Sequence, residues 1–236
     1  LSYAADKPLI HVNHIEGHVS ANYISNPELK PPFVCLVVSG GHSHIVRVND
    51  YGDYTLLGQT TDDAAGEAFD KAARVLTLPS PGGPRIDALA EEGDPHYMQL
   101  PHPHTPGRYD YSFSGMKTAF LNAANKLEMK GEPLPKADMA ASFRHAVVSA
   151  LVEKAILAAK ETKAPALAMA GGVSANRLLR RMMQEEADKA GIPLYMPKLN
   201  LCTDNAAMIA SAAYFRLMKG ETAPLTLNAM PALRLV

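Results

Sequence analysis

Cysteine, net charge and long apolar runs are all scarce in this sequence, and each scarcity excludes a class of protein. Two cysteines, Cys35 and Cys202, are too few for a disulfide framework, so a reducing, cytoplasmic location is expected. A net charge of −1 over 236 residues excludes a global field that attracts nucleic acid. No apolar stretch has the length of a bilayer span and no signal-peptide pattern opens the chain, so no membrane partner is expected.

Any RNA binding would therefore have to use a local patch of positive charge. Arg177, Arg180 and Arg181 form a candidate patch, although the solvated face of a helix explains them equally well. The length predicts one large domain or two small ones, and an apolar fraction of 47% is ordinary for a globular protein. The first residue is Leu1 rather than methionine, which predicts a fragment or a trimmed chain.

Apolar periodicity and turn residues predict an α/β protein with a mixed sheet. Three successive strands separated by glycine-containing turns predict an antiparallel meander, and a later strand–helix alternation predicts helices on both faces. Residues 93–113 are rich in Pro, His and Gly and predict an irregular loop. Strands are expected over residues 7–13, 33–39, 43–49, 54–60, 166–170 and 193–196, and helices over residues 16–23, 63–78, 81–92, 114–125, 136–161, 174–190 and 204–219.

Two histidines near the start of the chain are candidate metal ligands. His14 and His18 are four residues apart, a spacing that places both imidazoles on one face of a helix. A pair of half-buried helix histidines bonded to backbone is the simpler alternative. Gly17 favours the metal, because glycine inside a helix costs roughly 1 kcal/mol and leaves space for an ion or substrate. Asp204 is a candidate third ligand, or else the cap of a helix.

Two glycine turns are candidate phosphate cradles. Residues 39–42 (SGGH) join two expected strands, where a ligand can approach the backbone closely, although a plain hairpin turn explains them too. Residues 171–176 (GGVSAN) follow an apolar strand, and Ser174 is expected to cap the next helix, whose amino end attracts anions. Asn176 lies in the first turn of that helix, within reach of a base or ribose.

Acidic and hydroxyl groups mark two further helix starts. Asp62 and Asp63 suit the amino end of a helix through its dipole, whereas Asp70 lies one turn further on, where that explanation weakens. Asp70 is therefore a candidate acceptor for a ribose or an amino-acid group. Ser114 opens the segment SGMKT, where a simple helix cap is the expected role.

Together these motifs resemble the family of tRNA N6-adenosine threonylcarbamoyltransferases, the TsaD-like proteins once labelled O-sialoglycoprotein endopeptidases. The matching segments follow the family order across nearly the whole chain, which makes the resemblance specific. They are VNHIEGH, LVVSGGHSHIV, DDAAGEAFDKAARVL, PGGPRID, YSFSGMKTAF, MAGGVSANRLLR and CTDNAAMIA.

The resemblance implies the two-lobed fold of actin, hexokinase and Hsp70 (ASKHA), with nucleotide between the lobes. Residues 1–30 would be a remnant of the first lobe with the metal-binding helix, residues 31–203 the second lobe with a helical insertion, and residues 204–236 a helix and tail returning to the first lobe. The acidic, Ser/Thr-rich phosphate turn that opens family members is missing, so most of the first lobe is expected to be absent. Weak metal binding and no measurable transfer by the chain alone then follow; full turnover would refute this expectation.

The implied reaction transfers threonylcarbamoyl from threonylcarbamoyl-adenylate to N6 of the adenosine 3′ of the anticodon, in tRNAs reading codons that begin with A. One divalent metal ion, iron (Fe²⁺) or zinc, is implied, held by His14, His18 and Asp204. ATP, ADP or AMP are implied as alternative occupants of the cleft. The substrate contacts implied by motif are Val37, Val38, Ser39, Gly40, Gly41, Asp70, Gly83, Asp87 and Asn176.

The implied partners are tRNA and, in a bacterial complex, a pseudo-catalytic homologous subunit and a small P-loop ATPase. A chain that lacks most of the first lobe is expected to expose apolar surface and to self-associate.

Three other functions are weighed against the transferase. A zinc peptidase of the His-Glu-x-x-His type needs glutamate directly after the first histidine, but that position is Ile15 and Glu16 comes one step later. A non-catalytic assembly partner with this fold predicts that the metal triad is missing, yet all three candidate ligands are present. A sugar-kinase function has no acceptor-activating aspartate in a suitable context.

Overall fold

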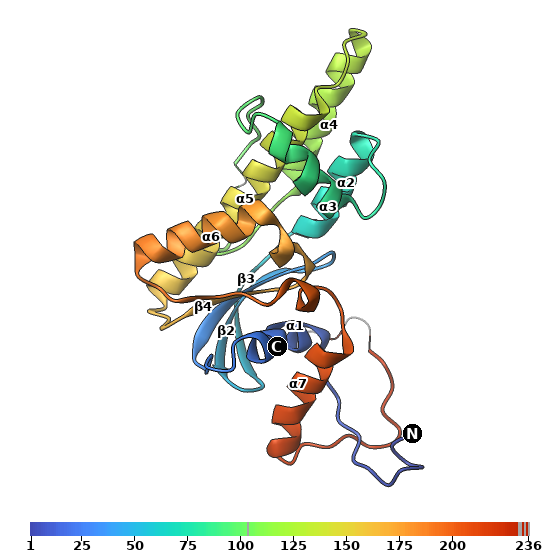
Figure 1. The fold of residues 1–236 in the computed structure, drawn as a ribbon, viewed down its shortest axis with the longest axis vertical. Coiled ribbons are helices and arrows are strands. Elements are labelled where there is room, and N and C mark those ends of the chain that lie inside the picture. The colour runs from blue at the N-terminus through green and yellow to red at the C-terminus, as the bar shows by residue number, and fades with distance from the viewer. Residues whose placement is uncertain (103, 231–232, 234, 236) are drawn as a thin grey trace.

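The computed structural model describes residues 1–102, 104–230, 233 and 235, and its centre is a five-stranded mixed sheet with helices on both faces (Figure 1). The strand order is β3-β2-β1-β4-β5. The predicted meander is confirmed, because β1 pairs antiparallel with β2 and β2 with β3, while β4 runs parallel to β1. The strands are β1 (Phe33–Val38), β2 (Ser43–Asp50), β3 (Asp53–Gln59), β4 (Leu167–Ala170) and β5 (Leu194–Tyr195).

The central strand β1 explains how the sheet divides the molecule into two cores. All six residues of FVCLVV are buried, and their side chains alternate between the two faces. Val34 and Leu36 join a large core with the helices of one face, whereas Cys35 and Val37 join a smaller core with α1. A continuous apolar run is what a strand covered on both faces requires.

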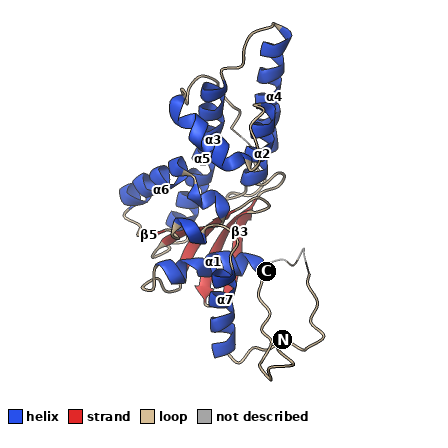
Figure 2. Ribbon diagram, turned by 45° about the vertical axis from the view of Figure 1, so that its right-hand side comes forward, coloured by secondary structure: helices blue, strands red, loops and turns tan. Residues whose placement is uncertain are grey.

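The helices are distributed unequally over those faces. Helices α2 to α6 contribute to the large core, and α1 with α7 lies on the opposite side of the sheet (Figures 1 and 2). Among the described helices, none combines the length and the apolar character needed to span a membrane. The helices are α1 (His14–Ser25), α2 (Ala65–Val75), α3 (Gly82–Leu89), α4 (Ser114–Met129), α5 (Lys136–Glu161), α6 (Arg177–Ala190) and α7 (Ala206–Met218), with short 3₁₀ turns at Ala90–Glu92, Gly172–Ala175 and Leu199–Leu201.

The predicted first strand, over residues 7–13, is wrong. Within this segment only Leu9 makes a β-bridge, to Ala223, and the rest is irregular and partly exposed. Its apolar residues therefore have no partner strand, and local β-propensity without pairing does not make a strand. Several helix starts also differ from the prediction. Helix α1 begins two residues earlier, α2 and α7 begin two residues later, α3 begins one residue later, and α6 begins at Arg177 after a separate 3₁₀ turn.

Gly171 holds the end of β4 against the end of β1. Its φ is +86°, and a Cβ at this position would lie 2.2 Å from the carbonyl oxygen of Val38. The neighbouring Gly172 has no such restriction, since the nearest atom to its Cβ position is Thr203 Cγ2 at 3.8 Å. Only the first glycine of the pair is therefore required by the backbone.

We expect Gly171→Ala to lower the free energy of unfolding by about 2 kcal/mol or more, because it adds both a left-handed backbone penalty and a clash with Val38. Gly172→Ala is the matched control and should cost less than about 1 kcal/mol. Urea unfolding followed by circular dichroism measures both. Equal losses for the two variants would contradict the assignment.

Candidate functional site

The start of α1 places two histidines on one face of the helix. The side chain of Asn13 caps α1 by accepting a hydrogen bond from the backbone N–H of Ile15 at 2.9 Å. His14 thereby becomes the first helical residue, and His18 follows one turn later. Their ring centroids are 4.7 Å apart in an edge-on arrangement.

Asp204, far along the chain, meets these two imidazoles. Its Oδ1 lies 3.5 Å from His14 Nε2 and 3.2 Å from His18 Nε2. One ligand atom from each of the three residues falls within 4.8 Å of the others. The capping alternative for Asp204 is wrong, because Asn205 is the residue that caps α7, through a 2.9 Å hydrogen bond from Met208 N–H. The predicted convergence of the three side chains is thus present in the fold.

His18 has the environment of a ligand. Its side chain is 1% exposed. Nδ1 has no hydrogen-bond partner among the described residues, and the 3.2 Å contact of Nε2 with Asp204 Oδ1 does not have hydrogen-bond geometry. Burial, and to a smaller extent His14, lowers the pKa of His18 to about 4 against the opposing effect of the Asp204 carboxylate. The imidazole is therefore neutral near pH 7, which is the form that coordinates metals. Two imidazoles and a carboxylate fit zinc or iron, with positions left for other ligands.

Glu16 lies on the opposite side of α1 from the histidines. Its side chain is 2% exposed and forms a two-pronged ion pair with Arg216 of α7, with Nη2 2.8 Å from Oε2. A carboxylate held there cannot act as base on water at the His14–His18 face. The structure therefore gives the peptidase hypothesis no general base at Glu16.

The first glycine turn lies beside the three candidate ligands. Ser39 N–H donates to the carbonyl of His42 at 2.8 Å, and the His42 ring is 6.3 Å from the His14 ring. Val37 and Val38 are fully buried, so a ligand at this turn would meet their backbone rather than their side chains. His42 received no separate role from the sequence, and its position in the SGGH turn was the available signal.

The second glycine turn meets the first through Gly171, which packs against Val38. Ser174 does not cap α6 as predicted; Asn176 does, by accepting a hydrogen bond from Leu179 N–H at 2.9 Å. Ser174 is instead fully buried, and its hydroxyl has no partner in the described structure. Both glycine turns and the amino end of α6 consequently border one region of the molecule.

The predicted substrate-binding acids also have partners within the fold. Asp87 is buried, accepts from Arg144 Nη1 at 2.9 Å and from Arg177 N–H at 3.2 Å, and so ties together α3, α5 and α6. Asp70 accepts from Gly82 N–H at 2.8 Å and joins α2 to the start of α3. Gly83 follows in the first turn of α3. These contacts place all three residues along the α2–α3 side of the large core.

Asp62 caps α4, although α2 is the helix that follows it in the sequence. Its carboxylate accepts from Phe113 N–H at 2.8 Å and from the Ser112 and Ser114 hydroxyls, so it serves the start of α4. Ser114 is therefore held by a cap and does not itself provide one. Asp63 pairs with Lys71 and Lys117, both at 2.8 Å.

The predicted arginine patch is divided by the fold. Arg180 turns inward and donates to the carbonyl oxygens of Ser174 and Pro197, both at 3.1 Å. Arg177 and Arg181 remain exposed on α6. Two exposed guanidinium groups, rather than three, are thus available to an RNA phosphate.

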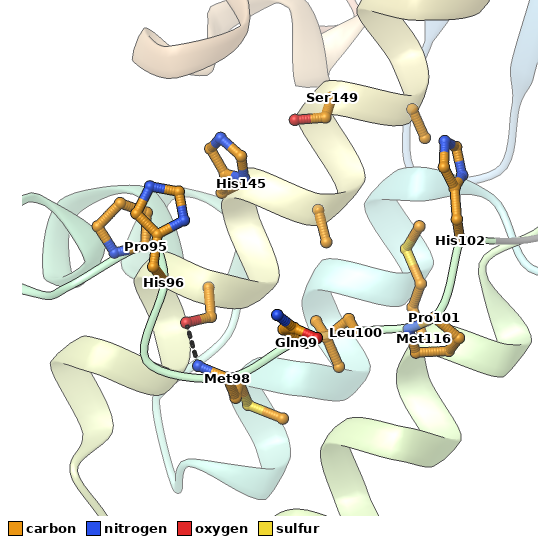
Figure 3. Close-up of a pocket in the computed structure, with 13 residues that line it drawn as sticks. Pro95, His96, Met98, Gln99, Leu100, Pro101, His102, Met116, His145 and Ser149 are labelled. Atoms are coloured by element: carbon orange, nitrogen blue, oxygen red, sulfur yellow. Dashed lines mark hydrogen bonds between the residues drawn. The ribbon is translucent and has the colours of Figure 1, made fainter.

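A cavity of about 320 Å³ lies elsewhere, between residues 95–102 and α5 (Figure 3). His96 and His145 both line it, and their rings meet edge-on with centroids 5.5 Å apart. The hydroxyl of Ser142 accepts from Met98 N–H at 3.2 Å and fixes the loop to the helix. None of the predicted site residues lines this cavity. The sequence predicted only an irregular loop for residues 93–113, so it gave no signal for a cavity here.

Comparisons with known proteins agree with the motif resemblance. The family model "TsaD: tRNA N6-adenosine threonylcarbamoyltransferase" matches residues 1–211. A protein of that name from Clostridium perfringens (strain SM101 / Type A) is 55% identical over 236 residues, which cover all of this chain and 70% of the relative. One from Clostridium botulinum (strain Kyoto / Type A2) is 53% identical, with 100% and 69% covered.

Solved structures support the fold class alone. A full-length HypF in a phosphate- and nucleotide-bound form superposes with a TM-score of 0.68 at 16% identity, over 92% of this chain and 37% of that one. HypF of T. kodakarensis gives a TM-score of 0.65 at 15% identity, over 93% and 38%. The mixed sheet flanked by helices is therefore the ASKHA-like arrangement predicted from the sequence.

The low pKa of His18 generates a pH prediction for the metal-free chain. On unfolding, this imidazole regains a pKa near 6.5, so the unfolded state binds the extra proton between pH 6.5 and about 4. The free energy of unfolding should therefore fall as pH decreases through that window, by on the order of 3 kcal/mol from His18 alone. Urea unfolding at several pH values, in the presence of a chelator, measures it.

His18→Gln should flatten this part of the pH profile, while His104→Gln, at an exposed position, should leave it unchanged. A profile that keeps the unaltered chain's slope in His18→Gln would contradict the assigned environment.

Proposed function

The chain belongs to the TsaD family of tRNA N6-adenosine threonylcarbamoyltransferases, and we propose that it modifies tRNA by the reaction of that family. Threonylcarbamoyl is transferred from threonylcarbamoyl-adenylate to N6 of the adenosine 3′ of the anticodon, in tRNAs that read codons beginning with A. The observation that carries the proposal is the meeting of His14, His18 and Asp204 next to the glycine turn at residues 39–42.

The reaction is an acyl transfer at a mixed anhydride. The N6 amine attacks the carbamoyl carbon, the bond from that carbon to the phosphate oxygen breaks, AMP leaves, and the amine loses a proton. The protein's task is to hold the adenylate and the amine in line, which requires positioning more than covalent chemistry. A divalent cation held by His14, His18 and Asp204 would supply Lewis-acid chemistry, either at the anhydride or at the leaving phosphate.

We propose His14, His18 and Asp204 as the ligands of that ion, iron or zinc. Buried His18 supports this choice: neither ring nitrogen makes a hydrogen bond, although Nε2 lies 3.2 Å from Asp204 Oδ1, and a buried polar atom without a hydrogen bond is costly. The backbone around Ser39, Gly40 and Gly41, with Val37 and Val38, is proposed to face the phosphate. Residues proposed for the nucleoside and threonylcarbamoyl groups are Asp70, Gly83, Asp87 and Asn176, and ATP, ADP or AMP would occupy the same cleft.

The proposed partners follow from the family. A tRNA substrate is part of the reaction, and the exposed guanidinium groups of Arg177 and Arg181 on α6 are proposed to contact its phosphates. A pseudo-catalytic homologous subunit and a small P-loop ATPase are proposed as bacterial partners. Self-association of this chain and a cytoplasmic location, where tRNA is modified, complete the proposal.

Transfer of labelled threonine tests the function directly. Threonylcarbamoyl-adenylate made from labelled threonine is incubated with tRNA and the chain, alone and with the two partner proteins, and the tRNA is digested and analysed by mass spectrometry. We expect N6-threonylcarbamoyladenosine when the partner proteins are present, and none from the chain alone. Its absence under both conditions would overturn the proposed function.

Metal binding tests the site independently of turnover. We expect Asp204→Asn to weaken Zn²⁺ binding by about 100-fold in calorimetry, because the carboxylate is the only anionic ligand of the three. His14→Ala should have a comparable effect. Asp53→Asn, an exposed acid on β3, is the matched control and should bind as the unaltered chain does.

If Asp204→Asn and His14→Ala both keep the metal content of the unaltered chain, the ligand assignment is wrong, whatever the transfer assay shows.

A further inference from the structure

The two helices that supply the candidate metal ligands are joined at a second point. Asp204 immediately precedes the start of α7, and Arg216 lies in its last turn, twelve residues later. Arg216 reaches α1 at Glu16, between the two histidines in sequence but on the other side of the helix. Thus α7 meets α1 at both of its ends.

Glu16 and Arg216 form a buried, two-pronged ion pair with short contacts. Arg216 Nε lies 2.9 Å and 3.2 Å from the two carboxylate oxygens of Glu16, and Nη2 lies 2.8 Å from Oε2. The Glu16 side chain is 2% exposed and that of Arg216 is 18% exposed. A two-pronged, mostly buried ion pair of this kind restricts the orientation of α7 relative to α1, whereas apolar contacts are less directional.

Arg216 also connects the segments that flank both helices. Its Nη1 donates to Glu221 at 2.6 Å, after α7, and lies 3.4 Å from His11 Nε2, before α1. The Leu9–Ala223 bridge joins the same two segments. One guanidinium therefore organises the far end of the α1–α7 pair.

Asp204 has little else to fix it. Its side chain is 75% exposed, and its contacts in the described structure are those to the two imidazoles. Asn205 caps α7 and also donates to the Thr203 carbonyl at 2.8 Å, so the backbone of Asp204 moves with the start of the helix. The orientation of α7 consequently sets the position of the carboxylate.

A small rotation is enough to matter. A helix of 13 residues is about 20 Å long, so a tilt of about 5° about one end moves the other by roughly 2 Å. Metal ligands must be held within about 0.5 Å of their productive geometry. Near the middle of the pair, Ile209 Cδ1 occupies the space that a Cβ on Gly17 would need, so the two helices are in close contact there.

We propose that Glu16 and Arg216 are positioning residues that set the distance between Asp204 and the two imidazoles. The inference rests on the proposed metal site and adds residues that do not touch the ion. A buried ion pair contributes little net stability compared with apolar packing, but it specifies one arrangement, which is what this site requires.

Zn²⁺ affinity of the full chain, measured by competition with a chromophoric chelator well below the unfolding temperature, tests the proposal. Glu16→Gln keeps the shape of the side chain, removes its charge and leaves Arg216 its contact with Glu221. We expect its Zn²⁺ dissociation constant to rise about tenfold or more. Arg216→Lys keeps the positive charge but loses the two-pronged contact with Glu16. Its Zn²⁺ dissociation constant should lie between those of the unaltered chain and Glu16→Gln.

A double-mutant cycle separates positioning from a general structural effect. If Glu16 acts through Asp204, then Glu16→Gln should weaken binding less than twofold when Asp204 has already been replaced by alanine. An equal loss in both backgrounds would show that Glu16 does not act through the carboxylate and would overturn the proposal.

Two controls account for charge and stability. Glu161→Gln makes the same chemical change at the surface partner of Arg108, and Leu151→Ala destabilises the core on the other face of the sheet. Both should keep the unaltered dissociation constant. Should Glu16→Gln fail to fold, Arg216→Lys and its combination with Asp204→Ala provide the same cycle.

The outcomes distinguish this inference from the proposed function. If the folded Glu16→Gln variant binds Zn²⁺ as tightly as the unaltered chain, the positioning role is overturned and the proposed metal site stands. An unaltered chain that binds no Zn²⁺ overturns the metal site and the positioning role together.

Discussion

Close packing of α1 against α7 is the constraint on which the candidate site depends. One helix carries two imidazoles and the other begins just after the carboxylate, so neither has a site without its neighbour. Gly17 allows the approach because a Cβ there would lie 2.8 Å from Ile209 Cδ1. The hydroxyl of Ser211 adds a 3.0 Å hydrogen bond to the Ser20 carbonyl. Small residues and one buried ion pair therefore determine where the ligands meet.

The sheet supplies the other half of the arrangement. Because β1 and β4 run parallel, their carboxyl ends come together, and each is followed by a glycine turn. The α1–α7 pair covers one face of the same sheet, so the ends of α1 and β1 bring His14 to His42. This is the position at which ligands bind in open α/β sheets. The candidate metal ligands and the backbone proposed to face the phosphate therefore lie together, in a chain whose net charge is near zero.

Several polar residues have both a structural role and a predicted chemical one. Asp87 joins helices through its hydrogen bonds and Asn176 caps α6, yet both are also predicted to contact substrate. A side chain fixed in this way is already oriented before a ligand arrives, which lowers the entropic cost of binding. The same reasoning applies to Asp70, which joins α2 and α3.

The sequence by itself determined the types and most of the bounds of the elements, because helical and strand periodicity and turn residues are local properties. It also determined the ligand candidates, through the four-residue histidine spacing and the motif order. Tertiary structure alone decided which residue caps which helix, as with Asp62 at α4 and Asn205 in place of Asp204. It also decided that residues 7–13 lack a strand partner and that Glu16 pairs with Arg216, 200 residues away. Such outcomes depend on contacts between segments distant in sequence, which no local pattern records.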